Sequence, residues 1–293
     1  MNPVVLYFAS GDSLYSGTAL LVMAIVVSPF LQSRRALLFR NIVAWLALTM
    51  VVMASAPFAW ATYALFYSSF VFWYVASNLA TPPRTKARPR LASAVLMFTL
   101  LAVLSASEFS YRRMPRIKGP FAGQLVVIGD SISSGIDPRV PAWPALLQQM
   151  TGVPVKNLAR PGAQTIEGQN MALGVSSGDH LVLVEVGGND LLAGVPSKEF
   201  GQALDTLLSR LTMPGRTVVM FELPLLPQRI AYGQIQRKLA AKYGVKMIPK
   251  RYFVDVIKGA DATSDGLHLS DTGAHRMAAL VAKALSGVLK AST

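Results

Sequence analysis

Cysteine is absent from the 293 residues, and histidine is nearly so. Without thiols the chain forms no disulfide bonds and has neither a cysteine nucleophile nor a zinc–thiolate site. The three histidines, His180, His268 and His275, are too few for us to expect a multi-histidine metal centre. We therefore predict no metal ion and no organic cofactor.

Acidic residues are scarce in residues 1–118, which hold only Asp12 and Glu108 against 11 Lys and Arg. The whole chain has a formal net charge of +13 and is 52% hydrophobic, above the roughly 45–50% of soluble domains. The basic residues of this half flank hydrophobic segments, where they favour contact with anionic lipid headgroups. Residues 119–293 contain no basic patch interleaved with aromatics, so we predict no nucleic-acid partner.

Four hydrophobic stretches lie in the N-terminal half, each close to the ~20 residues that a helix needs to cross a bilayer. We predict an all-α transmembrane region at residues 1–108 with spans at about 14–32, 38–56, 58–78 and 91–108. No acidic or basic residue falls in the centre of a span. This favours an anchor or a docking surface over a transporter, because transport paths usually need ionisable groups within the membrane.

The short loops between these spans predict their orientation. Basic residues gather in the first and third loops, whereas the second loop carries no charge, so both basic loops belong in the cytoplasm. This places both ends of the region, and the C-terminal domain, on the periplasmic side of a bacterial inner membrane. A further basic cluster after the fourth span opposes this orientation, but alternation over three loops outweighs it. These residues are Arg34, Arg35 and Arg40, then Arg84, Lys86, Arg88 and Arg90, and finally Arg112, Arg113, Arg116 and Lys118.

After a linker at residues 109–122, short apolar runs alternate with helical stretches. This alternation predicts parallel βαβ units and an α/β fold, a three-layer αβα sandwich with a five-stranded sheet, in a domain at 123–293. The predicted strands are 124–129, 153–158, 180–187, 216–223 and 245–249, and the predicted helices are 142–151, 165–173, 198–212, 230–243 and 271–289.

Residues that can carry chemistry lie where the predicted strands end. Ser131 follows the first strand, Gly162 the second and Gly187–Asp190 the third, and the carboxyl ends of parallel strands meet at one edge of a sheet. Asp265 and His268 are close enough for one turn to present both. The set offers a nucleophile, a base, a group that orients the base, and donors for an oxyanion. Each part alone is also typical of a turn or a surface loop, but the combination favours a serine ester hydrolase.

This pattern resembles the SGNH subgroup of GDSL-type esterases and lipases, and residues 142–147 and 184–190 are similar to its bacterial thioesterase/lysophospholipase branch. The resemblance covers about 124–289 and implies a flavodoxin-like hydrolase fold. Ile132 and Leu269 replace a usual Leu and Pro, and neither change removes a catalytic group. The resemblance implies a triad of Ser131, His268 and Asp265, an oxyanion hole of Ser131, Gly162 and Asn189, and supporting roles for Asp130, Gly188 and Asp190.

Two apolar segments beside the predicted site, 191–196 and 223–227, either line an acyl channel or pack against helices. The first arrangement favours a lipid or lysophospholipid substrate, so we expect a membrane-anchored serine esterase acting on acyl or thio esters next to membrane lipid. One alternative is an esterase or transferase for O-acyl groups, such as acetyl, on a cell-envelope glycan. Another is a non-catalytic membrane interaction protein. The sequence leaves acyl length, acceptor, oligomeric state and protein partners open.

Two other serine motifs are rejected. Gly11–Leu14 reads Gly-Asp-Ser-Leu, but it lies at the start of a membrane span without the other motif blocks. Residues 174–178 match the Gly-x-Ser-x-Gly elbow, which requires a strand before it and a helix after it. Here a predicted helix precedes and a strand follows. We predict no catalytic role for Ser13 or Ser176.

Overall fold

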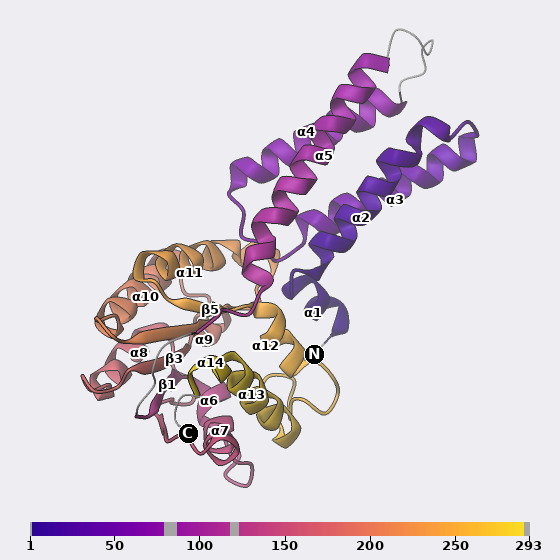
Figure 1. The fold of residues 1–293 in the computed structure, drawn as a ribbon. Helices are drawn as coiled ribbons and strands as arrows, with labels where there is room; N and C mark the ends of the chain where they lie inside the picture. Colours follow the sequence, from indigo (N-terminus) through magenta and orange to yellow (C-terminus); the bar gives the residue numbers. More distant parts are fainter. Residues whose placement is uncertain (1, 79–86, 118–122, 290–293) are drawn as a thin grey trace. The chain divides into compact units, whose positions relative to one another are not determined.

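The computed structural model describes residues 2–78, 87–117 and 123–289. The chain divides into two compact units (Figure 1). The first unit, the α/β unit, consists of residues 1–6, 112–225 and 231–293, and the second, the helical unit, consists of residues 7–111 and 226–230.

The α/β unit contains five parallel strands in the order β2-β1-β3-β4-β5. This confirms the predicted parallel five-stranded sheet, and each strand lies inside its predicted range. Its first strand neighbours both β2 and β3, so the chain changes direction across the sheet at that point, where open α/β sheets bind ligands. The strands are β1 Leu125–Gly129, β2 Val155–Asn157, β3 Leu181–Glu185, β4 Thr217–Phe221 and β5 Lys246–Ile248.

All five predicted helices of this part form, and three short helices were not predicted. The short ones, α6, α9 and α12, each start at or just after the end of a strand. The predicted final helix is interrupted at Leu285, which separates α13 from α14. The helices are α6 Ser131–Ser134, α7 Trp143–Thr151, α8 Thr165–Met171, α9 Gly188–Ala193, α10 Ser197–Leu211, α11 Ile230–Tyr243, α12 Lys250–Ile257, α13 Asp271–Ala284 and α14 Ser286–Leu289.

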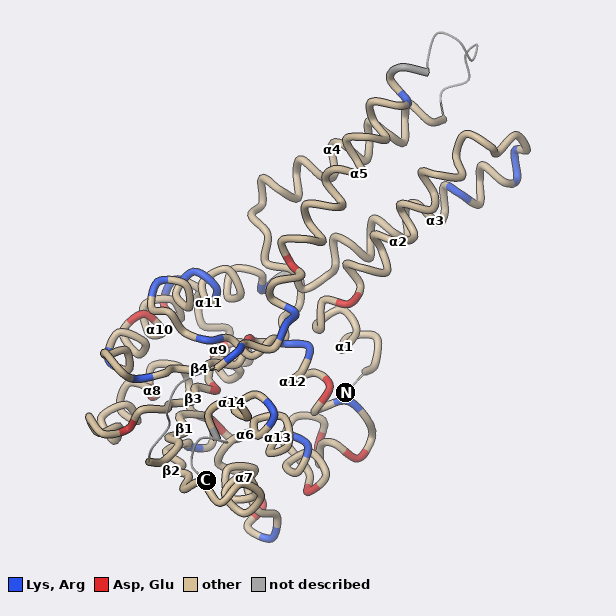
Figure 2. The backbone as a smooth tube through the Cα atoms, viewed as in Figure 1, with Lys and Arg blue, Asp and Glu red and all other residues tan. Residues whose placement is uncertain are grey.

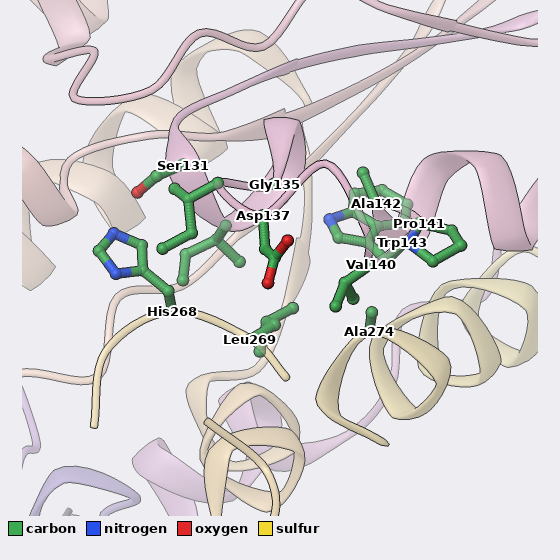
Figure 3. Close-up of a pocket in the computed structure, with 12 residues that line it drawn as sticks. Ser131, Gly135, Asp137, Val140, Pro141, Ala142, Trp143, His268, Leu269 and Ala274 are labelled. Carbon is green, nitrogen blue, oxygen red and sulfur yellow. The ribbon is translucent and has the colours of Figure 1, made fainter. Parts of the chain in front are cut away.

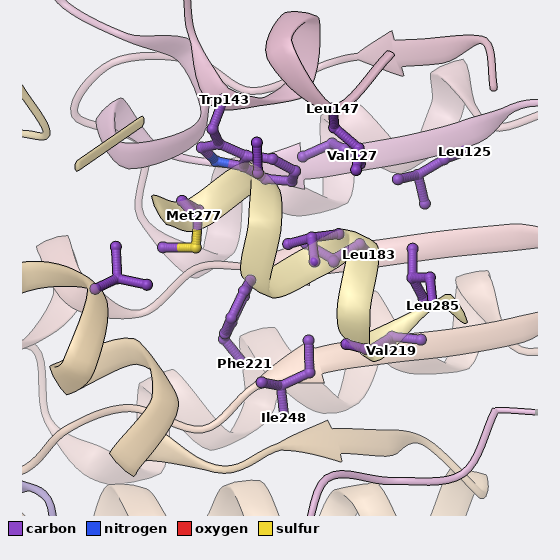
Figure 4. Packing of buried hydrophobic residues seen from close by; sticks show 14 of the residues in the cluster. Leu125, Val127, Trp143, Leu147, Leu183, Val219, Phe221, Ile248, Met277 and Leu285 are labelled. Carbon is purple, nitrogen blue, oxygen red and sulfur yellow. The ribbon is translucent and has the colours of Figure 1, made fainter. Parts of the chain in front are cut away.

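Both faces of the sheet are covered, which explains why its strands are continuous apolar runs. Leu125, Val127 and Leu183 pack with α7, α12 and α13 in one core, shown in Figure 4. Their neighbours Val126 and Val182 point to the other face and pack with α8, α10 and α11. Burying each such side chain contributes about 1.5–3 kcal/mol. The two cores confirm the three-layer αβα sandwich.

Four long helices make up most of the helical unit, at the places of the four predicted spans. Here α2 packs against α3, α4 against α5, and α2 also against α5. Three segments are long and apolar enough to cross a membrane, at 12–30, 34–52 and 89–112. Helix α4 has the length, but its Tyr, Ser and Asn residues lower its hydropathy and it is not among the three. The helices are α1 Pro3–Ala9, α2 Asp12–Val27, α3 Arg34–Val52, α4 Trp60–Asn78 and α5 Ala87–Phe109.

Charged residues are rare along these helices (Figure 2). Only 33%, 28% and 28% of the most apolar windows in these three segments is buried, so most side chains there are at least partly accessible. Buried Arg40 is near the start of α3, where its guanidinium donates to Ser28 and Asn78 at 2.6 and 2.8 Å. The predicted basic positions 84, 86 and 118 lie outside the described residues, as does the linker segment 118–122.

Candidate active site

The residues after β1 form a tight turn that presents Ser131. The Asp130 carboxylate caps α6, accepting from the Ile132 N–H at 2.9 Å. Ser131 is the first residue of α6, and its backbone N–H donates to no other residue in the described part of the chain. The turn therefore leaves both a hydroxyl and an unpaired donor at the carboxyl end of β1.

Gly162 and Asn189 follow the two neighbouring strands and are linked through Ala163. Gly162 has φ +73°, a left-handed conformation that favours glycine, and its N–H has no acceptor among the described residues. The Asn189 side-chain amide donates to the Asp130 carboxylate at 3.1 Å and to the Ala163 carbonyl at 3.0 Å. These two bonds fix the orientation of the amide beside the Ser131 turn.

Asp265 and His268 form a short pair in the loop before α13. The Asp265 Oδ2 lies 2.6 Å from His268 Nδ1, and Oδ1 accepts from the backbone N–H groups of Leu267 and His268 at 2.9 and 2.8 Å. These hydrogen bonds from His268 and Leu267 hold the pKa of Asp265 well below its usual range. Asp265 therefore remains a carboxylate that is hydrogen-bonded to the imidazole ring.

The His268 ring and the Ser131 hydroxyl line the same pocket and point toward each other (Figure 3). Because Nδ1 is bound to Asp265, Nε2 is the nitrogen that faces Ser131. No hydrogen bond between Ser131 and His268 is formed among the described residues, as is common before a substrate binds.

The predicted supporting residues join the neighbouring loops. Asp190 Oδ2 accepts from the Thr165 N–H and hydroxyl at 2.8 and 3.0 Å, which connects α9 to the start of α8. Burial raises the pKa of Asp190, although the Thr165 bonds oppose this shift. A Cβ on Gly188 would lie 3.4 Å from the Asp130 carboxylate. All eight predicted site residues therefore lie in the loops and short helices at the carboxyl edge of the sheet.

Most of the residues around the pocket beside Ser131 and His268 are apolar. Its one described carboxylate, Asp137, is held by Arg139 in a fork of 2.8 and 3.0 Å bonds, which lowers the pKa of Asp137 to about 2. The predicted channel segments 191–196 and 223–227 do not line this pocket. Its walls are Ile132, Gly135, Ile136, Val140, Pro141, Ala142, Trp143, Leu269 and Ala274.

Sequence reasoning missed a buried group under the Ser131 turn. Glu185, the last residue of β3, accepts from the Ser133 hydroxyl at 2.8 Å, and Ser133 accepts from the Trp143 indole at 3.2 Å. The sequence feature that could have indicated this group is a single acidic residue, Glu185, within the apolar run 181–186. The described residues contain no group of three or more His, Asp or Glu arranged to hold a metal ion.

Fold and site together form an α/β sandwich that carries a serine, a histidine–aspartate pair and free backbone donors at one edge of its sheet. The model of the GDSL-like lipase/acylhydrolase family matches residues 127–276, and the chain belongs to that family. This confirms the predicted SGNH/GDSL resemblance and the prediction that the protein is an enzyme of this ester-hydrolase class.

Several known proteins are similar to the chain. An arylesterase from Vibrio mimicus is 32% identical over 200 residues, which cover 61% of this chain and 88% of that protein. Thioesterase 1/protease 1/lysophospholipase L1 from Escherichia coli K12 is 28% identical over 159 residues, covering 50% and 76%. The solved structure of the psychrotrophic esterase EstA from Pseudoalteromonas sp. matches with a TM-score of 0.50 and 17% identity, covering 56% and 97%, and supports the fold.

Proposed function

We propose that the protein is a membrane-anchored serine esterase in which Ser131 is the nucleophile, His268 the general base and Asp265 the residue that orients the base. The 2.6 Å contact between Asp265 and His268, beside the Ser131 hydroxyl, is the observation that carries this proposal. In the proposed reaction, His268 Nε2 takes the Ser131 proton as Oγ attacks the ester carbonyl carbon. It then returns that proton to the leaving alkoxide or thiolate, and water releases the acyl group by the same steps in reverse.

The Ser131 and Gly162 N–H groups and the Asn189 amide are the proposed oxyanion donors. Both backbone donors are free among the described residues, so they can bind a developing charge without first losing another partner. The Asn189 amide already makes two bonds. In the proposed complex, the Asn189 N–H that donates to the Ala163 carbonyl would also donate to the oxyanion.

The proposed anchor is the helical region 1–108, joined by a linker at 109–122 to a hydrolase domain at 123–293. Support comes from the three long apolar segments and their exposed side chains, since exposed apolar surface of this extent needs lipid or a partner to cover it. The distribution of Lys and Arg supports a periplasmic position for the hydrolase domain.

A lipid-like acyl ester is the substrate class that we favour. Three large apolar side chains near the site are exposed: Ile136 by 48%, Leu192 by 67% and Leu267 by 40%. Ile136 lines the pocket, Leu267 precedes His268, and Leu192 lies three residues after Asn189. An acyl chain placed over these side chains would remove them from water, at about 25 cal/mol per Å² of apolar surface buried.

A second candidate is the removal or transfer of short O-acyl groups on a glycan. The pocket favours it, because the space beside Ser131 and His268 is small and offers little room for a long chain. In this case the apolar rim would contact the membrane or another surface instead of the acyl chain.

Turnover of aryl esters by the intact chain in detergent tests both candidates. We expect Ser131→Ala to abolish turnover. We also expect kcat/KM to rise from acetyl to longer acyl chains, by about tenfold for each methylene group that contacts the protein. A sharp preference for acetyl would instead support the glycan ester. Unchanged turnover in Ser131→Ala would remove Ser131 as the nucleophile.

A further inference from the structure

A wholly buried carboxyl group outside the triad lies directly under the nucleophile turn. Glu185 ends β3 and pairs in register with Gly129, the residue before Asp130 and Ser131. A Cβ on Gly129 would lie 3.0 Å from the Glu185 carboxyl and 2.6 Å from the Ser133 hydroxyl. Glycine at 129 therefore lets this carboxyl group approach the turn closely.

Glu185 belongs to a continuous network of polar contacts. The Trp143 indole donates to the Ser133 hydroxyl, which donates to Glu185 Oε2, and the Asp130 N–H points to the same oxygen at 3.4 Å. From Asp130 the network continues through its carboxylate to the Asn189 amide. Glu185 thus supports both the nucleophile turn and, through Asp130, a proposed oxyanion donor.

Of the two adjacent carboxyl groups, Asp130 is the one suited to carry the charge. It accepts two N–H bonds, from Ile132 and Asn189, and these stabilise a carboxylate. Glu185 makes no ion pair within the described residues, and its burial and the nearby Asp130 charge raise the pKa of Glu185 well above its usual value. The other ionisable groups that face Asp130 are His268 and Asp190.

On this basis, and resting on the proposed esterase function, we propose that Glu185 is a positioning residue that acts as a neutral carboxylic acid. It accepts from Ser133 with one oxygen and holds its proton beside the Asp130 carboxylate. Ionised Glu185 would place two negative charges side by side under Ser131, which would displace the turn. Catalysis then requires a neutral hydrogen-bonding group at position 185, although the residue touches no substrate.

Two substitutions test whether position 185 needs a neutral hydrogen-bonding side chain, and not only the volume or the charge of glutamate. Glu185→Gln keeps a neutral donor and acceptor of the same length, so we expect kcat within about threefold of the native chain. Glu185→Leu removes the polar contacts and keeps the bulk, so we expect kcat to fall about 10²-fold with little change in KM, because the reacting groups are misplaced. Thermal unfolding of both variants establishes that they are folded.

Glu222 provides the matched control, since it is equally buried at the end of β4 but is paired with Arg237 at 2.7 Å. The infrared spectrum of the intact protein at neutral pH should contain a protonated-carboxyl C=O band that Glu185→Gln removes. Glu222→Gln should leave this band and the kcat of the folded protein unchanged, although loss of a buried ion pair lowers its stability.

Equal losses of kcat in Glu185→Gln and Glu185→Leu, while the native chain shows Ser131-dependent turnover, would overturn the proposal for Glu185 alone. An infrared band that survives in Glu185→Gln would also overturn it. Absence of turnover in the native chain would instead contradict the proposed function and the catalytic part of this proposal, and the infrared band would still decide the protonation of Glu185.

Discussion

Asp265 combines high exposure with a lowered pKa. Its side chain is 49% exposed, so burial has little effect on its pKa. The pKa is lowered by three hydrogen bonds, which Asp265 accepts from the His268 and Leu267 backbone N–H groups and from the His268 ring. A carboxylate whose folded pKa lies below its unfolded value stabilises the fold above the unfolded pKa. That contribution is lost only as the pH falls through the folded value. Protonation of Asp265 should therefore not be the cause of any loss of activity at moderately acidic pH.

Replacing this carboxylate tests its orienting role. We expect Asp265→Asn to lower kcat by about 10⁴-fold over the whole pH range, because the amide favours the wrong imidazole tautomer. Asp271→Asn is the matched control, since Asp271 forms a similar but exposed pair with His275 at 3.6 Å on α13. Ester hydrolysis rates between pH 5 and 9 provide the measurement. A fall of less than about tenfold for Asp265→Asn would show that the imidazole is oriented by other groups.

At the scale of single residues, much of the candidate site was predictable from motifs at strand ends. Ser131, Gly162 and Asn189 follow strand ends, and Asp265 and His268 share one loop, whereas their catalytic roles stay predictions. Glu185 was not assigned a role, because a strand residue shows in sequence only that it is surrounded by apolar neighbours. Its function depends on the register with Gly129, which is a property of the folded sheet.

At the scale of elements, strands and long helices were predictable because their apolar runs are long. The short helices α6 and α9 were not, since each has too few residues to show a helical period. Both begin directly after strands, and both carry site residues. The sequence of the nucleophile turn was recognised, but its helical shape depends on the Asp130 cap and on the close approach of β3.

A substitution at Gly129 tests how closely this turn is packed. Gly129→Ala would place a Cβ 2.6–2.7 Å from Ser133 and 3.0 Å from Glu185, so the turn must shift. We expect a loss of about 1–3 kcal/mol in stability together with at least a tenfold loss of kcat. Gly178→Ala, where a Cβ meets nothing within 4 Å, should change stability by about 0.5 kcal/mol or less. Thermal unfolding and ester hydrolysis measure both effects, and equal behaviour of the two variants would contradict the proposed close packing.

At the scale of the whole molecule, the family match and the apolar helices concern different parts of the chain. The family model covers residues 127–276, whereas the last of the three membrane-length segments ends at Arg112. Sequence predicted helices at all four proposed spans. Only the helix at 58–78, α4, is not among the three membrane-length segments of the described residues, because its Tyr, Ser and Asn residues lower its hydropathy.

At this scale we predict that the chain is anchored in a membrane with a defined orientation. We expect the intact chain to remain with membranes after washing at alkaline pH, because its exposed apolar segments need lipid. A reporter that is active only in the periplasm, fused after Thr293, should be active, and the same reporter inserted within residues 79–86 should not. Release of the chain by the wash would contradict the anchor, and the opposite pattern of reporter activity would reverse the orientation.

Labelling by a fluorophosphonate is the most direct measurement of the central claim, an activated serine at position 131. Such a probe reacts with a serine hydroxyl only when a base and oxyanion donors activate it. The intact chain in detergent should be labelled, Ser131→Ala should not, and Ser13→Ala, which alters a buried serine in α2, should be labelled as fully as the native chain. Equal labelling of Ser131→Ala and the native chain, or no labelling of either, would contradict the account.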